Sequence, residues 1–591
     1  MTYRAPVKDL MFGMQHLADA QAIASLPAFA HAGLDTAQAV LEECARLNEE
    51  VIAPLNVVGD RQPSYFRDGQ VVTTPGFKEA FAQFVQGGWQ GLHHPEEFGG
   101  QGLPKLIHAA CSEIVQSANM SFALCPLLTD GAIEALLTAG SDEQKARYIP
   151  KMVEGAWTGT MNLTEPQAGS DLSLVRTRAE PQADGTYRLF GTKIFITYGE
   201  HDMAHNIVHL VLARVAGAPE GVKGISLFIC PKVLDDGSRN DVKCVSIEHK
   251  LGIKASPTAV LQYGDAGGAV GYLVGQENRG LEYMFIMMNS ARFAVGLQGV
   301  AIAERAYQKA VQYARDRIQS RPVDGSASRA APIIHHPDVR RMLMTMRAYT
   351  EGCRAMALVG AAAFDAGHAH PDAATRESNQ AFYEFLVPLI KGLSTEMSLE
   401  VASLGVQIHG GMGYVEETGA AQYLRDAKIL TIYEGTTAIQ ANDLVGRKTV
   451  RDGGATARAL ADQVSKTVTE LKRASGVHER AMALRLEQAR EDFLSATEFI
   501  VNRAKSDPAQ TYAGSVYYLM LAGTLVAGWQ MGRSLLAAQS PAAREHDAQF
   551  CDAKIMTARF FADHLLVRCH AYRASIVEGA ESALGLSVEA F

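Results

Sequence analysis

The chain has 591 residues, of which 47% are hydrophobic and 20% are charged. This composition is typical of a water-soluble globular protein with three or four packed units, and it excludes disordered and membrane-spanning chains. The formal net charge is -9, with both signs interspersed. Because nucleic-acid binding needs clustered Lys and Arg, nucleic acid is excluded as a partner.

The N-terminal sequence and the cysteines indicate a reducing compartment. The first residues, MTYRAPVKDLMFGMQHLADA, contain an early acidic residue and no unbroken apolar stretch, unlike a secretory signal or an Arg-rich transit peptide. The 8 cysteines are scattered without a CxxC pair, so buried reduced thiols are expected, and no disulfide framework or metal site is predicted. We therefore expect a cytoplasmic protein.

Periodicity along the chain predicts helices, then strands, then helices again. The fold class is therefore mainly α with a central β-domain, followed by an additional C-terminal helical domain. A hairpin turn is expected at Ala183-Asp184-Gly185. The predicted units, in chain order, are an N-terminal extension (1–34), a helical domain (35–156), a β-domain (157–275), a helical bundle (276–450) and a further helical domain (451–591).

One stretch, 515–531, carries no charge over the length of a short membrane span. Gly523, Thr524, Gly528 and Gln530 interrupt it, and polar amphipathic helices are predicted on both sides. These features favour a buried central helix of a bundle over a membrane span, so membrane contact is expected to be peripheral at most.

A polar loop is predicted where a strand ends near Met161. The segment 164–171, Thr-Glu-Pro-Gln-Ala-Gly-Ser-Asp, contains Pro166 and Gly169, which favour a tight turn that exposes backbone amides and the Thr164 and Ser170 hydroxyls. Such a loop suits a polyoxygenated ligand, although an ordinary Ser/Asp helix cap fits these residues equally well.

A strand with alternating side chains is predicted over 191–198. Phe195 and Thr197 lie on the same face, where a ring and a hydroxyl can stack on and hydrogen-bond to a flat heterocycle. A lone Phe/Thr pair is more often part of an ordinary half-buried sheet.

Two segments in the last third add glycines and a carboxylate. Gly410 and Gly411 let backbone approach a ligand closely, a pattern that is weak alone. Glu434 is followed by Gly435 and Thr436, so its carboxylate is expected at a sharp turn where a new helix starts. A single Glu is usually a solvated surface charge, and only the combination of segments favours a functional role.

In combination these segments resemble the acyl-CoA dehydrogenase family over residues 35–448. The resemblance implies a fold of a helical domain, a β-barrel and a four-helix bundle, with FAD as cofactor and an acyl-CoA substrate in fatty acid metabolism. The pieces that carry it, in order, are Pro95-Glu96-Glu97-Phe98-Gly99-Gly100, the 164–171 loop, the 191–197 strand, Lys250-Leu251-Gly252-Ile253, the helix of Arg292, Arg425-Asp426-Ala427 and Tyr433-Glu434-Gly435-Thr436.

The resemblance also implies roles for individual residues. Glu434 would be the catalytic base, and Arg292 would lie at a helix opening near the substrate. The implied FAD contacts are Leu163, Thr164, Ser170, Phe195, Ile196, Thr197, Arg317, Gln407, Gly410, Gly411 and Thr436, of which Arg317, Gln407, Gly410 and Gly411 would reach the FAD of a partner subunit. The implied substrate contacts are Ser170, Arg292 and Gly435.

The implied reaction yields a trans-2-enoyl-CoA. Glu434 would remove the pro-R proton from Cα while Cβ delivers hydride to flavin N5, and electrons would pass to an electron-transferring flavoprotein. Because an unperturbed carboxylate is too weak a base, we expect burial to raise the pKa of Glu434. Some relatives carry the base on the helix of Arg292, but residues 289–291 contain no acid here, so Glu434 is the only matched candidate.

The chain departs from the family pattern after Arg317. Ser320-Arg321 and an insert over 322–332 stand where the family has Phe-Gly, and Pro337 replaces a usual Gln after His336. The two terminal extensions resemble a long bacterial subgroup that includes 3-methylmercaptopropionyl-CoA dehydrogenases, which implies a homodimer. An acyl-CoA oxidase that uses oxygen and a non-catalytic assembly protein are the alternative functions, and the acyl chain length stays open.

Overall fold

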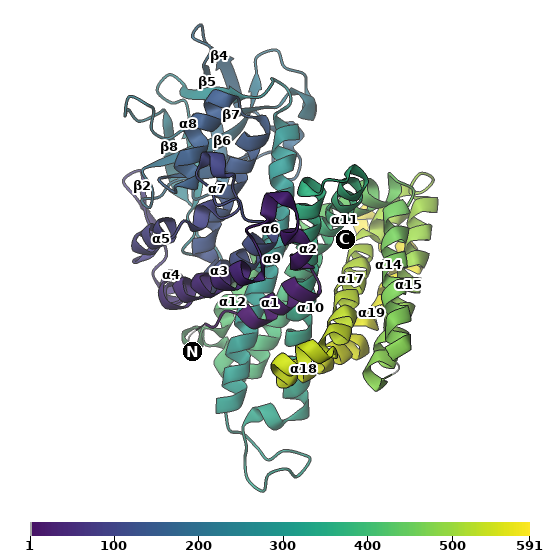
Figure 1. Ribbon diagram of the computed structural model, residues 1–591. Coiled ribbons are helices and arrows are strands. Elements are labelled where there is room, and N and C mark those ends of the chain that lie inside the picture. Colours follow the sequence, from purple (N-terminus) through teal and green to yellow (C-terminus); the bar gives the residue numbers. More distant parts are fainter. Residues whose placement is uncertain (1–2, 475) are drawn as a thin grey trace.

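The computed structural model describes residues 3–474 and 476–591 (Figure 1). Strands gather at one end of the molecule, long helices run through its centre, and the C-terminal helices stand along one side (Figure 1). The predicted fold class, mainly α with a central β-domain and additional C-terminal helices, is confirmed.

The part of the chain before residue 157 is mostly helical, as predicted. Its helices are α1 Val7–His16, α2 Ala20–Ala24, α3 Leu34–Leu47, α4 Leu55–Arg61, α5 Phe77–Gln86, α6 Lys105–Ala118, α7 Met120–Ala139 and α8 Asp142–Val153. Ser141 and Gln144 form a reciprocal capping box that starts α8. A small hairpin, β1 Tyr65–Arg67 and β2 Gln70–Val72, was not predicted. Asp68 and Gly69 at its turn both have positive φ, which is the Asp-Gly hairpin signal.

The β-domain closes on itself. Its strands are β3 Trp157–Asn162, β4 Arg178–Pro181, β5 Tyr187–Thr197, β6 Asn206–Val215, β7 Ser226–Pro231, β8 Val242–Ile247, β9 Thr258–Tyr263 and β10 Ala269–Val274. The order is β10-β7-β6-β4-β5-β9-β8, and β10 also pairs with β5, so five strands form a ring. The predicted turn at residues 183–185 joins β4 to β5, with Gly185 at φ +83°. The strand predicted over 191–198 is the second half of a longer strand, β5, which is bulged between Lys193 and Ile196.

The helical bundle is built on three long helices with two short ones beside them. These are α9 Gly280–Asp316, α10 Pro337–Ala369, α11 Ala373–His409, α12 Ala420–Ala427 and α13 Thr437–Asp443. Glycines bring α9 and α11 together: a Cβ on Gly296 would lie 2.5 Å from Ile390 Cγ2, and one on Gly299 would lie 2.3 Å from the Ser394 carbonyl oxygen. The short α12 and α13 complete the bundle, and the loop that contains Glu434 lies between them.

The C-terminal domain surrounds one apolar helix. Its helices are α14 Ala455–Ala474, α15 Val477–Arg503, α16 Pro508–Ala513, α17 Ser515–Ala538, α18 Pro541–Phe561, α19 Arg568–Glu578 and α20 Ala580–Leu584. The charge-free stretch lies in α17, which packs against α10, α11, α15, α18 and α19, so the predicted buried helix is confirmed. Gly523 and Gly528 are contact points, because a Cβ on either would lie within 3 Å of Leu393 or Leu566. Periodicity predicts a helix over 546–573, and the structure is helical over most of this range: the end of α18 and the start of α19 are joined by the π-helical segment Ala562–Leu566.

Among the described residues, two helices, α7 and α9, are long and apolar enough to cross a membrane, and 78% and 71% of their most apolar windows are buried inside the protein. The cysteines are all buried and free, as predicted.

Candidate active site

Glu434 lies in a strained turn that leads into α13. Its φ is +52°, and that of Gly435 is +84°. This region costs a residue other than glycine about 1–3 kcal/mol and persists only where the surroundings hold it. Here Lys391 Nζ donates to the Gly435 carbonyl oxygen at 2.7 Å, and Gln440 Nε2 donates to the Glu434 carbonyl oxygen at 3.2 Å. The turn is therefore fixed from the bundle side.

Charges on α9 and α11 face the Glu434 carboxylate. Burial raises the pKa of Glu434, and the cations of Arg292 and Lys391 offset only part of that rise. This is the direction expected for a base. Burial lowers the pKa of Lys391 to about 8. The Arg292 guanidinium is buried 3.8 Å from Asp443, and among the described residues its Nε has no hydrogen-bond partner.

The position of Arg292 corrects one expectation. It does not lie at a helix opening, because α9 begins at Gly280 and Arg292 lies about three turns inside it. The helix begins at Gly280, twelve residues before Arg292. The guanidinium lies 3.8 Å from Asp443 of α13, the helix that follows the turn, and the Glu434 carboxylate is near enough to raise the pKa of Arg292 against the effect of burial.

The predicted polar loop follows β3 and rests on a buried ion pair. Lys193 Nζ donates to Glu165 Oε1 at 2.8 Å and to the Leu163 carbonyl oxygen at 3.0 Å. Burial alone would raise the pKa of Glu165, but Lys193 and the Thr177 hydroxyl, together with the Arg176 amide, lower it to about 2. The sequence did not predict this pair. The available signal was a lysine next to the apolar run Ile194-Phe195-Ile196 of β5.

The predicted flavin contacts in the loop and in β5 differ in how exposed their side chains are. Phe195 is 58% exposed at φ +60°, and Thr197 is partly buried. The Ile196 side chain lies in the β core at 2% exposure, which leaves only its backbone for a ligand. Leu163 and Thr164 are partly exposed. Ser170 is exposed in the same loop, and neighbouring Asp171 accepts from the Ser173 amide, so the helix-cap interpretation also holds.

A second group of predicted residues lies at the far end of the bundle. Arg317 follows the last residue of α9, and Gln407 is in the last turn of α11, just before Gly410 and Gly411. The ring of Tyr313 stacks on that of His409 at 4.3 Å, so these two helix ends are adjacent. Arg317 is roughly 37 Å along α9 from Arg292. It therefore cannot join Glu434 of the same chain.

The two groups have the chemistry that a flavin dinucleotide needs. Phe195 offers an exposed ring with the Thr197 hydroxyl on the same strand, and no protein atom lies within 4 Å of where a Cβ would be on Gly410 or Gly411. Thr436 uses its hydroxyl to accept from the Ile439 amide at 3.3 Å and caps α13. The residues present fit FAD.

Two of the sequence segments that carry the family resemblance meet in space. The Ile253 amide donates to Asp426 Oδ1 at 2.6 Å, and Arg425 donates to the Leu251 carbonyl oxygen at 3.2 Å. A Cβ on Gly252 would lie 2.4 Å from the Arg425 carbonyl oxygen. This contact holds the segment that ends in Glu434 against the β-domain.

Comparisons with known proteins agree with this architecture. The chain matches family models described as acyl-CoA dehydrogenase N-terminal domain (residues 35–156), middle domain (160–266) and C-terminal domain (278–448), and as acetyl-CoA dehydrogenase C-terminal like (460–587). It is 57% identical to 3-methylmercaptopropionyl-CoA dehydrogenase of Ruegeria pomeroyi, with 100% of both chains covered. It is 35% identical to a broad-specificity linear acyl-CoA dehydrogenase of Mycobacterium tuberculosis, with 95% of each chain covered.

A solved structure shares the fold. An acyl-CoA dehydrogenase complexed with FAD from Bacillus anthracis superposes with a TM-score of 0.75 at 22% identity, covering 92% of this chain and 88% of that one. The matches to the family models and to full-length relatives show that this chain belongs to the acyl-CoA dehydrogenase family, whose members are FAD-dependent oxidoreductases.

Proposed function

We propose that this protein oxidises the Cα–Cβ bond of an acyl-CoA thioester to a trans-2-enoyl-CoA, with Glu434 as the base. The observation that carries the proposal is the Glu434 carboxylate itself. It lies in a strained turn with its pKa raised by burial, facing Arg292 and Lys391. A carboxyl group tuned in this way is suited to remove a weakly acidic C–H proton.

The chain's own residues would hold the reactants and move the proton. Bound FAD would supply the hydride acceptor at N5 while Glu434 takes the proton from Cα. The Glu434 amide would donate to the thioester carbonyl and so make that proton more acidic. The residues that would hold FAD of the same subunit are Leu163, Thr164, Ser170, Phe195, Ile196, Thr197 and Thr436. The residues that would contact the FAD of the partner subunit are Arg317, Gln407, Gly410 and Gly411.

The proposal includes partners. An electron-transferring flavoprotein would accept the electrons, and the chain would act as a homodimer in the cytoplasm. The separation of Arg317 from Arg292 along α9 supports a dimer, since Arg317 could then serve only a neighbouring copy's cofactor. The relative from Ruegeria pomeroyi makes 3-methylmercaptopropionyl-CoA the first substrate to test.

Replacing the base tests the proposal. Glu434→Gln should keep the yellow cofactor and lose about 10²–10⁴-fold in turnover with an artificial electron acceptor, since the geometry survives without the base. Glu417→Gln, at an exposed acid in the turn before α12, is the matched control and should retain activity. Near-normal activity of Glu434→Gln would refute the base, and a wild-type protein that cannot take up FAD would refute the flavoenzyme.

The electron acceptor needs a separate measurement. The reduced enzyme should stay reduced in air and be reoxidised when an electron-transferring flavoprotein is added. Rapid reoxidation by oxygen alone would indicate the oxidase alternative instead.

A further inference from the structure

The Glu434 turn is held by the protein on both of its sides. The hydrogen bonds from Lys391 and Gln440 reach carbonyl oxygens that follow the Glu434 Cα. On the other side stands Tyr433, whose amide donates to the Ile429 carbonyl oxygen at 3.1 Å and whose ring packs against the main hydrophobic core. The Tyr433 side chain is therefore the group through which the protein interior contacts the N-terminal side of the turn.

Gln298 of α9 binds the Tyr433 hydroxyl. The hydroxyl donates to Gln298 Oε1, and Gln298 Nε2 donates to Gln116 Oε1 of α6 at 3.1 Å. Both glutamines are buried. Because the amide nitrogen of Gln298 is used by Gln116, its amide oxygen faces Tyr433, and the direction of both hydrogen bonds is fixed.

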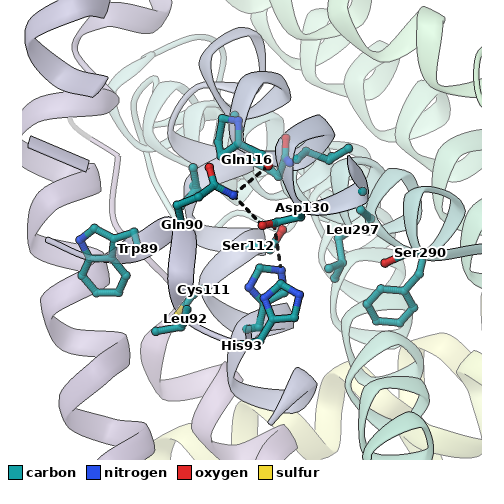
Figure 2. Close-up of a pocket in the computed structure, with 18 of the residues that line it drawn as sticks. Trp89, Gln90, Leu92, His93, Cys111, Ser112, Gln116, Asp130, Ser290 and Leu297 are labelled. Carbon is teal, nitrogen blue, oxygen red and sulfur yellow. Dashed lines mark hydrogen bonds and ion pairs between the residues drawn. The ribbon is translucent and has the colours of Figure 1, made fainter. Parts of the chain in front are cut away.

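Gln116 gives this chain of hydrogen bonds a rigid end. It belongs to α6, a helix that is buried along almost its whole length. Figure 2 shows Gln116 among the polar side chains that line a small cavity between α6, α7 and α9, with Gln90 and Asp130. The buried cation of Lys105 lines the same cavity. Gln116 therefore has polar surroundings, and Gln298 carries the polar contact from there to the turn.

The surroundings of Gln298 on α9 are apolar. Val295, Leu297 and Val300 are all buried hydrophobic residues of the same helix. A buried amide among such residues is costly unless both of its polar ends are bonded, and here both are. A fully bonded amide adds little net stability, but it allows only one arrangement of its partners. Gln298 is thus suited to fix geometry.

Geometry matters at this turn for two reasons. Glu434 has a φ of +52°, a conformation that persists only where the surroundings hold it. Proton removal also requires the carboxylate to be aligned with the C–H bond, and a displacement of about 1 Å can cost roughly a hundredfold in rate. A residue that fixes the turn can therefore affect the reaction without touching the substrate.

We infer that Gln298 is a positioning residue for the reaction: through the Tyr433 hydroxyl it fixes the N-terminal side of the turn and so holds the Glu434 carboxylate in line with the Cα–H bond. The inference rests on the proposed function, because the position of Glu434 matters only if Glu434 is the base. Since Gln298 acts through Tyr433, its contribution should appear in the rate of proton removal and not in the binding of the substrate.

Removing either partner of the hydrogen bond tests the inference. Tyr433→Phe keeps the ring, and Gln298→Met keeps the length of the side chain. The FAD-loaded variants are assayed on 3-methylmercaptopropionyl-CoA with an artificial electron acceptor. Each should lose about 10–100-fold in kcat while KM changes by less than about threefold. The double variant should lose no more than the slower single variant, because both substitutions remove the same bond.

A matched control removes another hydrogen bond between the same two helices. Ser117 Oγ of α6 donates to the Ala301 carbonyl oxygen of α9 at 3.3 Å, also inside the protein. Ser117→Ala should therefore leave kcat unchanged. Flavin absorbance and the midpoint of thermal unfolding show that each variant is loaded and folded, and Tyr433→Phe alone decides if Gln298→Met does not fold.

The pH profile and an isotope effect separate positioning from a change in the charge of the base. A misplaced carboxylate is slow at every pH, so the loss should persist on the alkaline plateau, where Glu434 is ionised in all variants. Deuterium at Cα should slow the variants at least as much as the wild type, because proton removal has become the slower step. A loss that vanishes on the plateau, or an isotope effect that disappears, would contradict positioning.

The inference and the proposed function fail in different ways. Normal kcat in both Tyr433→Phe and Gln298→Met, beside an inactive Glu434→Gln, would overturn the inference alone. A loss confined to KM would also overturn it, because Gln298 would then act on substrate binding. Near-normal kcat in Glu434→Gln would refute the proposed function, and the inference with it.

Discussion

Burial and two cations act in opposite directions on the Glu434 carboxylate. Burial disfavours the charged form and raises its pKa, whereas Arg292 and Lys391 favour the charged form and lower it. The result is a carboxyl group that is more basic than an exposed one and still able to ionise. Each of the two cations therefore helps to set the pKa of Glu434, and with it the pH above which the base is ionised.

Removing one of these charges should shift the pH dependence of the reaction. Lys391→Gln can still donate to the Gly435 carbonyl oxygen but loses its charge, so the pKa of Glu434 should rise further. Activity needs the ionised carboxylate, so the acidic limb of the kcat/KM profile should move to higher pH. Lys472→Gln, at an exposed ion pair with Glu487, should leave the limb in place. A limb that moves to lower pH in Lys391→Gln would contradict the assigned role.

The sequence predicted some residues and not others for a physical reason. Glu434, Phe195 and Thr197 stand in short segments whose local pattern already indicates a turn or an exposed strand face. Asp130 and His94 are separated by 36 positions and meet only through packing, with His94 Nε2 2.8 Å from Asp130 Oδ1. The spacing of residues along the sequence does not indicate such a contact, so this pair could not be predicted.

At the scale of elements, the flavin loop depends on one ion pair between β5 and the loop. Glu165 and Lys193 are almost fully buried, and breaking a buried pair leaves an uncompensated charge. Lys193→Met should therefore destabilise the protein by about 3–5 kcal/mol, seen as a lower denaturation midpoint in urea. The double variant Glu165→Gln/Lys193→Met removes both charges and should recover most of the loss. Equal loss in the two variants would mean that packing of the lysine stem, and not charge, dominates.

The same pair makes the loop sensitive to acid. The pKa of Glu165 is lowered from 4.5 to about 2 in the folded protein. A depressed carboxyl pKa contributes stability above the unfolded value, and that contribution is lost as the pH falls from 4.5 towards 2. The stability of the wild type relative to the double variant should therefore fall over this range, and a relative stability that rises there would contradict the pairing.

The close contact of α9 with α11 depends on Gly299, which gives a second prediction at the scale of elements. Gly299→Ala places a methyl group 2.3 Å from the Ser394 carbonyl oxygen, so α9 and α11 must separate, at a cost of about 1–3 kcal/mol. Gly532→Ala in α17 meets its nearest side-chain atom at 3.4 Å and should be neutral or stabilising, because alanine favours a helix. Thermal unfolding of the two variants measures the difference. Equal midpoints would contradict the close packing of α9 on α11.

Elements with a long apolar repeat were predicted correctly, whereas a short hairpin that depends on its turn residues was missed. Helices α9, α10 and α11 were predicted from their apolar period. The β1–β2 hairpin was missed, although Asp68-Gly69 is its turn signal, because its strands are only three residues long.

At the scale of the whole molecule, a buried charge network joins distant helices. The Arg354 guanidinium of α10 contacts Asp9 of α1 at 2.7 Å, Glu113 of α6 at 2.5 Å and Glu304 of α9 at 2.7 Å. Lys554 of α18 also binds Asp9. These charges are shielded from solvent, so salt screens them weakly. One guanidinium therefore fastens the N-terminal segment, the helical domain and the bundle to one another.

Loss of this guanidinium should weaken the assembly of domains. Arg354→Met leaves the buried carboxylates of Glu113 and Glu304 without their cation and leaves Asp9 with Lys554 alone, so it should lower the stability by about 3–5 kcal/mol. Arg341→Met removes an exposed partner of Asp338 and is the matched control, expected to change little. Urea denaturation at low and high salt measures both. Full recovery of Arg354→Met in high salt would show that the network is solvated and not buried.

The bonds between α1 and α18 also set an order of events during synthesis. Asp9 and Lys554 are 545 positions apart, so Asp9 leaves the ribosome long before its partner exists. At 5–20 residues per second, that interval is roughly half a minute to two minutes. Throughout it, the first helix has a surface made for a neighbour that has not yet been translated. Docking of α1 is therefore a late step, completed only when the chain is nearly finished.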